Sequence, residues 1–289
     1  RKRFMDEPRL KSSEKALEQM LLALEAGGFV KLEPESPKPP PEGQPSPADV
    51  KPYAAVLAHA TPELEKLLVF RSVHPVYGAY LVNQLGVADR DERIQAIESV
   101  LEIPRPLLRY LRVPWELSPG PLATTRLDAE LIRRGLIIAP VEDKPEDDGD
   151  DYDEADEHPP SLADKLRLLF DALCPEVTDV HTQSIWCAGE LLRFGGNFNK
   201  FVQSRDLVKQ EGIVFRHFLR LILLCGELAA VTPPDTTADA WQADLRDLAE
   251  QLTISCRAVD PASTDEIIDQ ARAADVISSP MADRSVRSG

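Results

Sequence analysis

The sequence predicts a mainly α-helical protein in which two helical blocks are joined by a disordered acidic linker. Apolar residues recur at helical spacing through most of the chain, whereas alternating, strand-like segments are few and short. Hydrophobic residues make up 43% of the 289 positions, which is enough for a sizeable core. A proline-rich stretch and an acidic stretch interrupt the periodic segments. The predicted organisation is a helix-strand piece at 1–33, a proline-rich linker at 34–50, a small helical domain at 51–140, an acidic linker at 141–160, a second helical domain at 161–275 and a flexible tail at 276–289.

The N-terminal piece is predicted to be a helix that ends at two glycines and leads into a short strand. Leu17, Met20, Leu21 and Leu24 share one helical face, and residues 29–32 then alternate like a strand. This order is typical of the end of a winged helix, as well as of many other helix-to-strand junctions. A second helix, glycine and strand-like run is predicted within 127–138.

The middle block is predicted to carry short helices that proline-containing loops separate. Ile103-Pro104-Arg105-Pro106 cannot continue a helix, because proline lacks the backbone donor and restricts the residue before it. A helix can restart after it, at 107–111. The other helices are expected at 54–57, 62–70, 77–85 and 90–101.

The C-terminal block is predicted to contain the longest helices. Ser161 can cap a helix over 162–173, because a serine side chain accepts a hydrogen bond from a free amide of the first turn. Trp241, Leu245, Leu248 and Leu252 share one face of another predicted helix, at 237–259. The two remaining helices are expected at 184–194 and 207–228.

The formal net charge of -16 repels phosphate backbones at long range, but the negative charge is concentrated. Residues 142–157 hold eleven Asp or Glu and one Lys, and removing this run leaves about -6 on the remainder. Nucleic-acid contact is therefore disfavoured for the chain as a whole, whereas a local basic face remains compatible with the composition.

Cysteine usage and hydropathy favour a cytoplasmic location and no membrane partner. The four cysteines lack the close spacing of zinc ligands and lie in apolar helical contexts, so we expect buried thiols. No apolar run reaches the ~20 residues that a membrane-spanning helix needs, and no signal peptide is recognisable. The chain begins at Arg1 rather than Met, which suggests a piece of a longer protein.

No segment carries a complete catalytic motif, and no cofactor is expected in this chain. Residues 153–156 spell Asp-Glu-Ala-Asp, but the run before them is acidic and cannot form the buried strand that such a box requires. A phosphate-binding loop of the GxxxxGK[ST] type is missing from the sequence. The five histidines lack both ligand spacing and an evident nucleophile partner.

The most informative cluster of charges is a basic stretch at 193–222. It holds six Lys or Arg and only two acids, a net charge of +4 in a strongly acidic chain. Arg216 and Arg220 lie one helical turn apart, so they share a face. They either bind phosphate groups or pair with internal carboxylates such as Glu190 or Glu227. The candidate nucleic-acid-binding residues are Arg205, Lys209, Arg216 and Arg220.

Residues 198–221 resemble the DSHCT domain, the helical C-terminal domain of exosome-associated DExH-box RNA helicases. The resemblance rests on Asp206, Glu211-Gly212, Arg216 and Arg220-Leu221. The gap from the Asp to the Glu-Gly is wider than in the family, and Leu219 stands where the family has a second Arg.

The resemblance implies a C-terminal accessory region of a DEAD/DExH-box helicase that contacts single-stranded RNA or DNA. ATP and magnesium would be needed only by motor domains in cis, whose motifs this chain lacks. A winged helix after the second motor domain would fit the N-terminal piece. The alternative is a non-enzymatic helical scaffold that binds protein partners through its helical faces.

Overall fold

The computed structural model describes residues 7–36, 53, 55–138 and 160–278, with side chains described as far as Gln270. The predicted linkers, apart from residues 34–36 and 160 at their edges, lie outside the described residues, as do residues 279–289 of the predicted tail.

The described residues form a mainly α-helical protein with one two-stranded sheet, which confirms the predicted fold class. A π-helical turn at Leu122–Leu127 leads into α6, and a 3-10 turn at Val208–Gln210 precedes α10. The elements are α1 (Glu7–Ala26), β1 (Val30–Glu33), β2 (Leu57–Ala60), α2 (Leu64–Leu67), α3 (Pro75–Leu85), α4 (Arg90–Ser99), α5 (Arg105–Leu108), α6 (Asp128–Arg133), α7 (Leu162–Leu173), α8 (Ala188–Arg193), α9 (Phe198–Ser204), α10 (Glu211–Ala229), α11 (Ala238–Arg257) and α12 (Pro261–Ser278).

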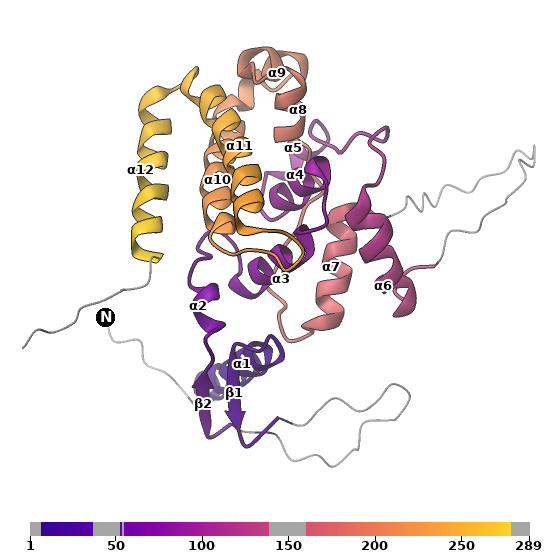
Figure 1. The fold of residues 1–289 in the computed structure, drawn as a ribbon, viewed down its shortest axis with the longest axis vertical. Helices are drawn as coiled ribbons and strands as arrows, with labels where there is room; N and C mark the ends of the chain where they lie inside the picture. Colours follow the sequence, from indigo (N-terminus) through magenta and orange to yellow (C-terminus); the bar gives the residue numbers. More distant parts are fainter. Residues whose placement is uncertain (1–6, 37–52, 54, 139–159, 279–289) are drawn as a thin grey trace, which may run out of the picture.

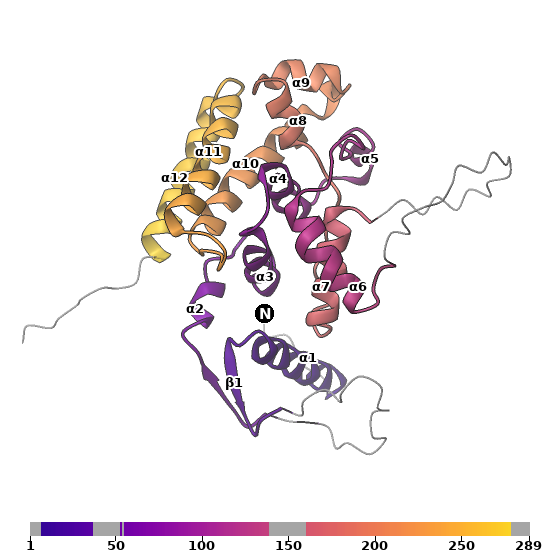
Figure 2. The same ribbon diagram turned by 45° about the vertical axis from the view of Figure 1, so that its right-hand side comes forward.

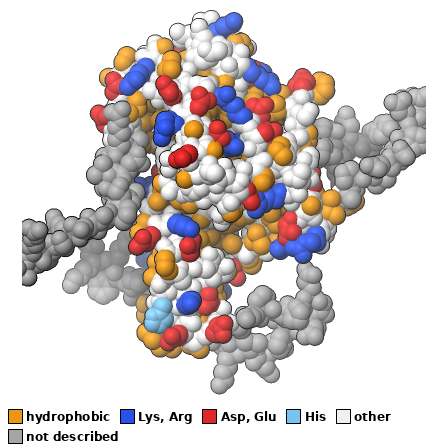
Figure 3. All heavy atoms as spheres, in the orientation of Figure 1, with side chains coloured by type: hydrophobic (Ala, Val, Ile, Leu, Met, Phe, Trp, Pro, Cys, Tyr) orange, Lys and Arg blue, Asp and Glu red, His pale blue; other side chains and the backbone are white. Residues whose placement is uncertain are grey.

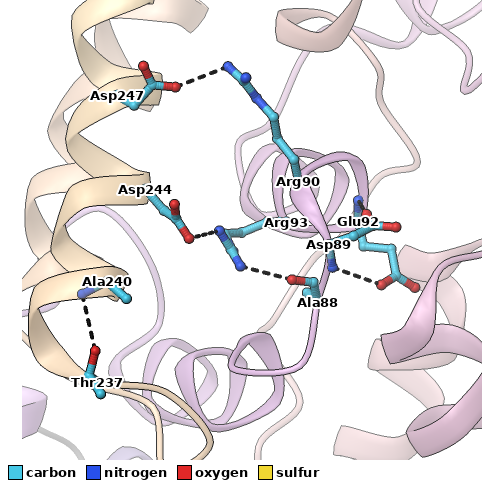
Figure 4. Close-up of polar contacts among 9 residues, drawn as sticks. All are labelled: Ala88, Asp89, Arg90, Glu92, Arg93, Thr237, Ala240, Asp244 and Asp247. Carbon is cyan, nitrogen blue, oxygen red and sulfur yellow. Dashed lines mark hydrogen bonds and ion pairs between the residues drawn. The ribbon is translucent and has the colours of Figure 1, made fainter.

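Side-chain caps fix the start of several helices where the sequence predicts them. The Ser161 hydroxyl accepts from the backbone N–H of Asp164, whose carboxylate accepts from the Ser161 backbone N–H, so α7 begins with a complete capping box. The Thr237 hydroxyl accepts from the backbone N–H of Ala240 at the start of α11 (Figure 4). Both predicted helices are confirmed.

Several local predictions were wrong in the type or the bounds of an element. Leu57, the end of the helix expected at 54–57, begins β2, which supplies the partner that β1 needs for its backbone groups. The strand expected at 136–138 is absent from those residues. The helices expected at 184–194 and 207–228 start later, at Ala188 and Glu211. Helix α12 also includes 276–278, which the sequence assigned to the tail.

The helices surround α4, which packs on α3, α7, α8 and α10. Helices α10, α11 and α12 pack side by side on one flank, while α1 lies with β1 and β2 at one end of the molecule (Figures 1 and 2). One continuous hydrophobic core takes side chains from both helical blocks of the sequence. Residues from the two helical blocks can therefore line one surface in a fixed arrangement.

Ion pairs join the N-terminal half of α4 to α11. Arg93 donates to Asp244 at 2.6 Å and to the Ala88 carbonyl oxygen at 2.8 Å, and Arg90 lies 3.2 Å from Asp247 (Figure 4). The Arg93 guanidinium also lies 5.5 Å from the centroid of the Trp241 ring, a cation–π contact. The basic residues at this end of α4 are thus neutralised within the fold.

Candidate nucleic-acid interface

Helix α10 packs against an aromatic cluster and against α4, α11 and α12, and only a narrow strip of its N-terminal half is exposed. Phe198 of α9 packs edge-on against Phe215 and Phe218 of α10, with ring centroids 6.2 and 6.1 Å apart. Phe201 adds a tilted contact with Phe218 at 6.1 Å. Of the two positions between Phe215 and Phe218, Arg216 is exposed and His217 is buried.

Two of the four predicted binding residues lie together on the outer side of α10. Arg216 and Arg220 are both exposed and are separated by one helical turn. Within the described residues Arg216 has no ion-pair or hydrogen-bond partner. One amino group of Arg220 donates to the Glu102 carbonyl oxygen at 3.2 Å, which leaves its charge without a carboxylate partner.

The other two predicted residues differ from each other in their environment. Lys209 is exposed in the 3-10 turn before α10 and has no ionic partner among the described residues. Arg205 donates to Glu190 at 2.5 Å, and Arg193 lies 3.8 Å from the same carboxylate. Glu190 therefore already neutralises Arg205 and is not a partner of Arg216 or Arg220.

Glu227, the second carboxylate that the sequence suggested as a partner, holds a loop instead. Its carboxylate accepts from the backbone N–H groups of Arg71 and Ser72 at 3.0 and 3.1 Å, and from the Ser72 hydroxyl at 2.6 Å. The loop between α2 and α3 is thereby fixed to α10, the helix that carries Arg220. Neither predicted carboxylate pairs with the α10 arginines.

Two hollows flank Arg220. The larger, of about 920 Å³, lies toward Arg105 and the loop at 181–184, and the smaller, of about 240 Å³, lies toward Arg71, His74 and Asp179. Arg220, Glu102 and His181 line both. Arg71 and Arg105 were missed by the sequence analysis, because they lie far from α10 in the chain and no local pattern marks them.

A buried polar cluster lies beneath the outer face, where α4, α8 and α10 meet. The Glu98 carboxylate accepts from the backbone N–H groups of Cys187 and Ala188 at 3.0 and 2.7 Å, and lies 3.0 Å from His217 Nε2. Glu98 and His217 are at most 2% exposed. Glu98 thus caps the start of α8 and holds α10 in place through His217.

The same cluster has the donor types of a metal site. Ligand atoms of Glu98, Cys187 and His217 all lie within 4.8 Å of one another. Burial is the main cause that raises the pKa of the Cys187 thiol well above its usual range, with the charge of Glu98 next. Both Glu98 oxygens already accept hydrogen bonds, whereas His217 Nδ1 has no hydrogen-bond partner among the described residues.

Basic and acidic side chains are interspersed over the face shown in Figure 3, and no broad cationic surface is visible in that view. Among the described residues, no helix has both the length and the apolar character needed to cross a bilayer.

Comparison of the chain with models of protein families, with curated proteins and with solved structures finds no significant match.

Proposed function

We propose that this chain is the C-terminal accessory region of a DEAD/DExH-box helicase, and that α10 contacts single-stranded nucleic acid. The observation that carries the proposal is the pair Arg216 and Arg220, exposed one turn apart and without carboxylate partners in the described residues. ATP and magnesium would act in motor domains that lie outside this chain.

Electrostatics support a polyanion as the ligand of this face. An exposed guanidinium keeps its charge at any physiological pH and offers up to five N–H donors in a geometry that matches phosphate oxygens. Arg216 and Arg220 have these donors largely free, and Lys209 adds a third unpaired charge before the same helix. Contacts with phosphates would release counterions, which favours binding at low salt.

The residues that resemble the DSHCT family occupy one structural unit, which supports the helicase assignment. Asp206 adopts a left-handed backbone conformation (φ 54°) in the turn after α9, and Glu211 is the first residue of α10. At the other end of the molecule, α1 leads into β1, which pairs antiparallel with β2 so that Val30 faces Ala60. A helix followed by two antiparallel strands is the order found at the end of a winged helix.

A salt titration of single-stranded RNA binding tests the proposal. Fluorescence anisotropy of a labelled oligonucleotide should give an affinity that falls linearly with the logarithm of salt concentration. Replacing both Arg216 and Arg220 by Ala should reduce the slope by about 1.4 units, since each phosphate contact with a single strand contributes about 0.7. Failure of the unmodified chain to bind RNA at 50 mM salt would refute the proposal.

A control variant with the same change in net charge distinguishes the loss of a local phosphate contact from a general effect of charge. Arg90→Ala with Arg246→Ala removes the same charge from exposed positions of α4 and α11, neither of which lines the hollows beside Arg220. This control should keep the salt slope of the unmodified chain. A control that loses as much affinity as the α10 double variant would indicate a nonspecific effect of charge.

A protein-binding scaffold is the second candidate, and one observation favours it. Leu10, Leu17 and Met20 of α1 are 46%, 56% and 61% exposed, on a helix whose N-terminal half makes little contact with the core. Exposed apolar side chains gathered on one element are common at protein interfaces. A pull-down of partners that persists after nuclease treatment, from a chain that fails to bind RNA, would favour this function over the first.

A further inference from the structure

The two hollows beside Arg220 bring together three arginines from distant parts of the chain. Arg71 follows α2, Arg105 is the first residue of α5, and Arg220 lies in the middle of α10. Arg220 lines both hollows, so it stands between the other two. None of these side chains pairs with a carboxylate in the part of the chain that the structure describes.

The balance of charge around the hollows is positive despite the acidity of the chain. Two carboxylates, Glu102 and Asp179, line the hollows against the three arginines, so the arginines outnumber the acids by one. Asp179 is 76% exposed and lies 3.6 Å from His74 Nε2, so its charge faces a histidine and water. His74 and His181 add ring nitrogens that can donate hydrogen bonds.

The walls of the hollows are fixed by hydrogen bonds that do not involve the arginine side chains. The Gln183 side chain accepts from the Ile103 N–H at 2.8 Å and donates to the Ile103 carbonyl oxygen at 3.1 Å. The Gln183 backbone N–H donates to the Ser99 carbonyl oxygen at 2.9 Å. On the other side, Glu227 fixes the backbone of Arg71 and Ser72 to α10. The arginines therefore project from a well-ordered frame.

We propose that the hollows on either side of Arg220 form a phosphate-binding cradle for two neighbouring phosphodiesters of one nucleic-acid strand. Arg220 lies between the two phosphates, Arg71 contacts the one in the smaller hollow, and Arg105 contacts the one in the larger. The choice of a nucleic acid as the ligand rests on the proposed function. The cradle extends the binding face from α10 to the first helical block, and the strand continues along α10 to Arg216.

Variants that leave α10 intact test the cradle. Arg71→Gln with Arg105→Gln should weaken the binding of single-stranded RNA at least tenfold at 0.1 M salt and reduce the salt slope by about 1.4 units. Glu102→Gln removes a carboxylate from both hollows and should have the opposite effect, tighter binding. The matched control, Arg90→Gln with Arg246→Gln, should change affinity less than twofold.

The outcomes separate the cradle from the proposed function. If Arg71→Gln with Arg105→Gln binds RNA like the unmodified chain while the α10 double variant is weakened, the cradle is wrong and the proposed function stands. If the unmodified chain binds no RNA, the proposed function fails, and inorganic pyrophosphate becomes the probe. Broadening of its ³¹P resonances by the unmodified chain but not by the Arg71/Arg105 variant would support a phosphate cradle; equal broadening, or none, would overturn it. Unchanged melting temperatures establish that the variants fold.

Discussion

Helices α4 and α10 each carry two arginines within about one turn, but the fold uses the two pairs in opposite ways. Arg90 and Arg93 of α4 face carboxylates of α11, and the Arg93 side chain is only 16% exposed. Arg216 and Arg220 of α10 face solvent and have no carboxylate partners in the described residues. Whether an arginine is available to a ligand therefore depends on the carboxylates that the tertiary structure places beside it. The number of basic residues in a segment does not determine this.

The largest expected effect on stability comes from replacing Glu98, at the buried end of α4. Glu98→Ala removes the acceptor of two backbone N–H groups and the partner of His217, all in the core. Leaving these buried polar groups without their acceptor should lower the free energy of unfolding by about 3–5 kcal/mol, measured by urea denaturation. Asp91→Ala, an exposed acid on the same helix, should cost under ~1 kcal/mol. Similar losses in both variants would contradict the role given to Glu98.

Thiol labelling reports whether this buried region stays closed. Burial raises the pKa of the Cys225 and Cys256 thiols to about 12 and that of Cys187 well above its usual range, which suppresses the reactive thiolate. A disulfide reagent at pH 8 should therefore modify only Cys174, which is half-buried, in the native protein, and all four cysteines in denaturant. Rapid native labelling of more than one thiol would show that the core opens readily.

The next effect compares the two arginine pairs directly. Arg93→Ala loses an ion pair, a hydrogen bond to a carbonyl oxygen and a cation–π contact, and should cost about 1–2 kcal/mol of stability without changing RNA affinity. Arg216→Ala should change stability by less than ~0.5 kcal/mol and weaken RNA binding. Thermal unfolding and anisotropy measure the two properties. Equal stability losses in the two variants would contradict the contrast between α4 and α10. A double-mutant cycle with Asp244→Ala would show how much of the stability lost in Arg93→Ala comes from the ion pair.

The smallest effect concerns a third arginine pair, at the C-terminal end of α6. Hydrogen bonds from Arg133 and then Arg134 lower the pKa of Glu130 to about 2, from an ordinary value of 4.5. A lowered folded-state pKa contributes stability above the unfolded-state value, and that contribution disappears as the pH falls through about 2. The stability difference between the unmodified chain and Glu130→Gln, followed by thermal melts, should therefore be greatest above pH 4.5 and shrink in acid. A difference that grows on acidification would contradict this account.

Local signals predicted the helices that carry their own caps and stripes. Ser161 and Thr237 mark the starts of α7 and α11, and Trp241 and Leu252 of the predicted stripe are buried. Strand β2 was missed because all its positions are exposed, so no alternation marks it, and only pairing with β1 explains it.

For the candidate interface too, some features could be predicted from local sequence and others could not. The outward face of Arg216 and Arg220 follows from helical spacing and could be predicted. The neutralisation of Arg205 by Glu190 could not, because the residues lie fifteen positions apart across a turn. Arg71 and Arg105 join Arg220 only through the packing of the two helical blocks, and no sequence pattern records that packing.

The clamp that Glu227 places on Arg71 and Ser72 has a consequence for recognition. Because the loop and α10 are joined by three hydrogen bonds, they are already arranged before any ligand arrives. Association then immobilises mainly the ends of arginine side chains, at about 0.5–1.5 kcal/mol for each, and does not also require a backbone segment to fold. Preorganisation of this kind lets a small contact area hold a strand that a flexible loop of the same charge would release.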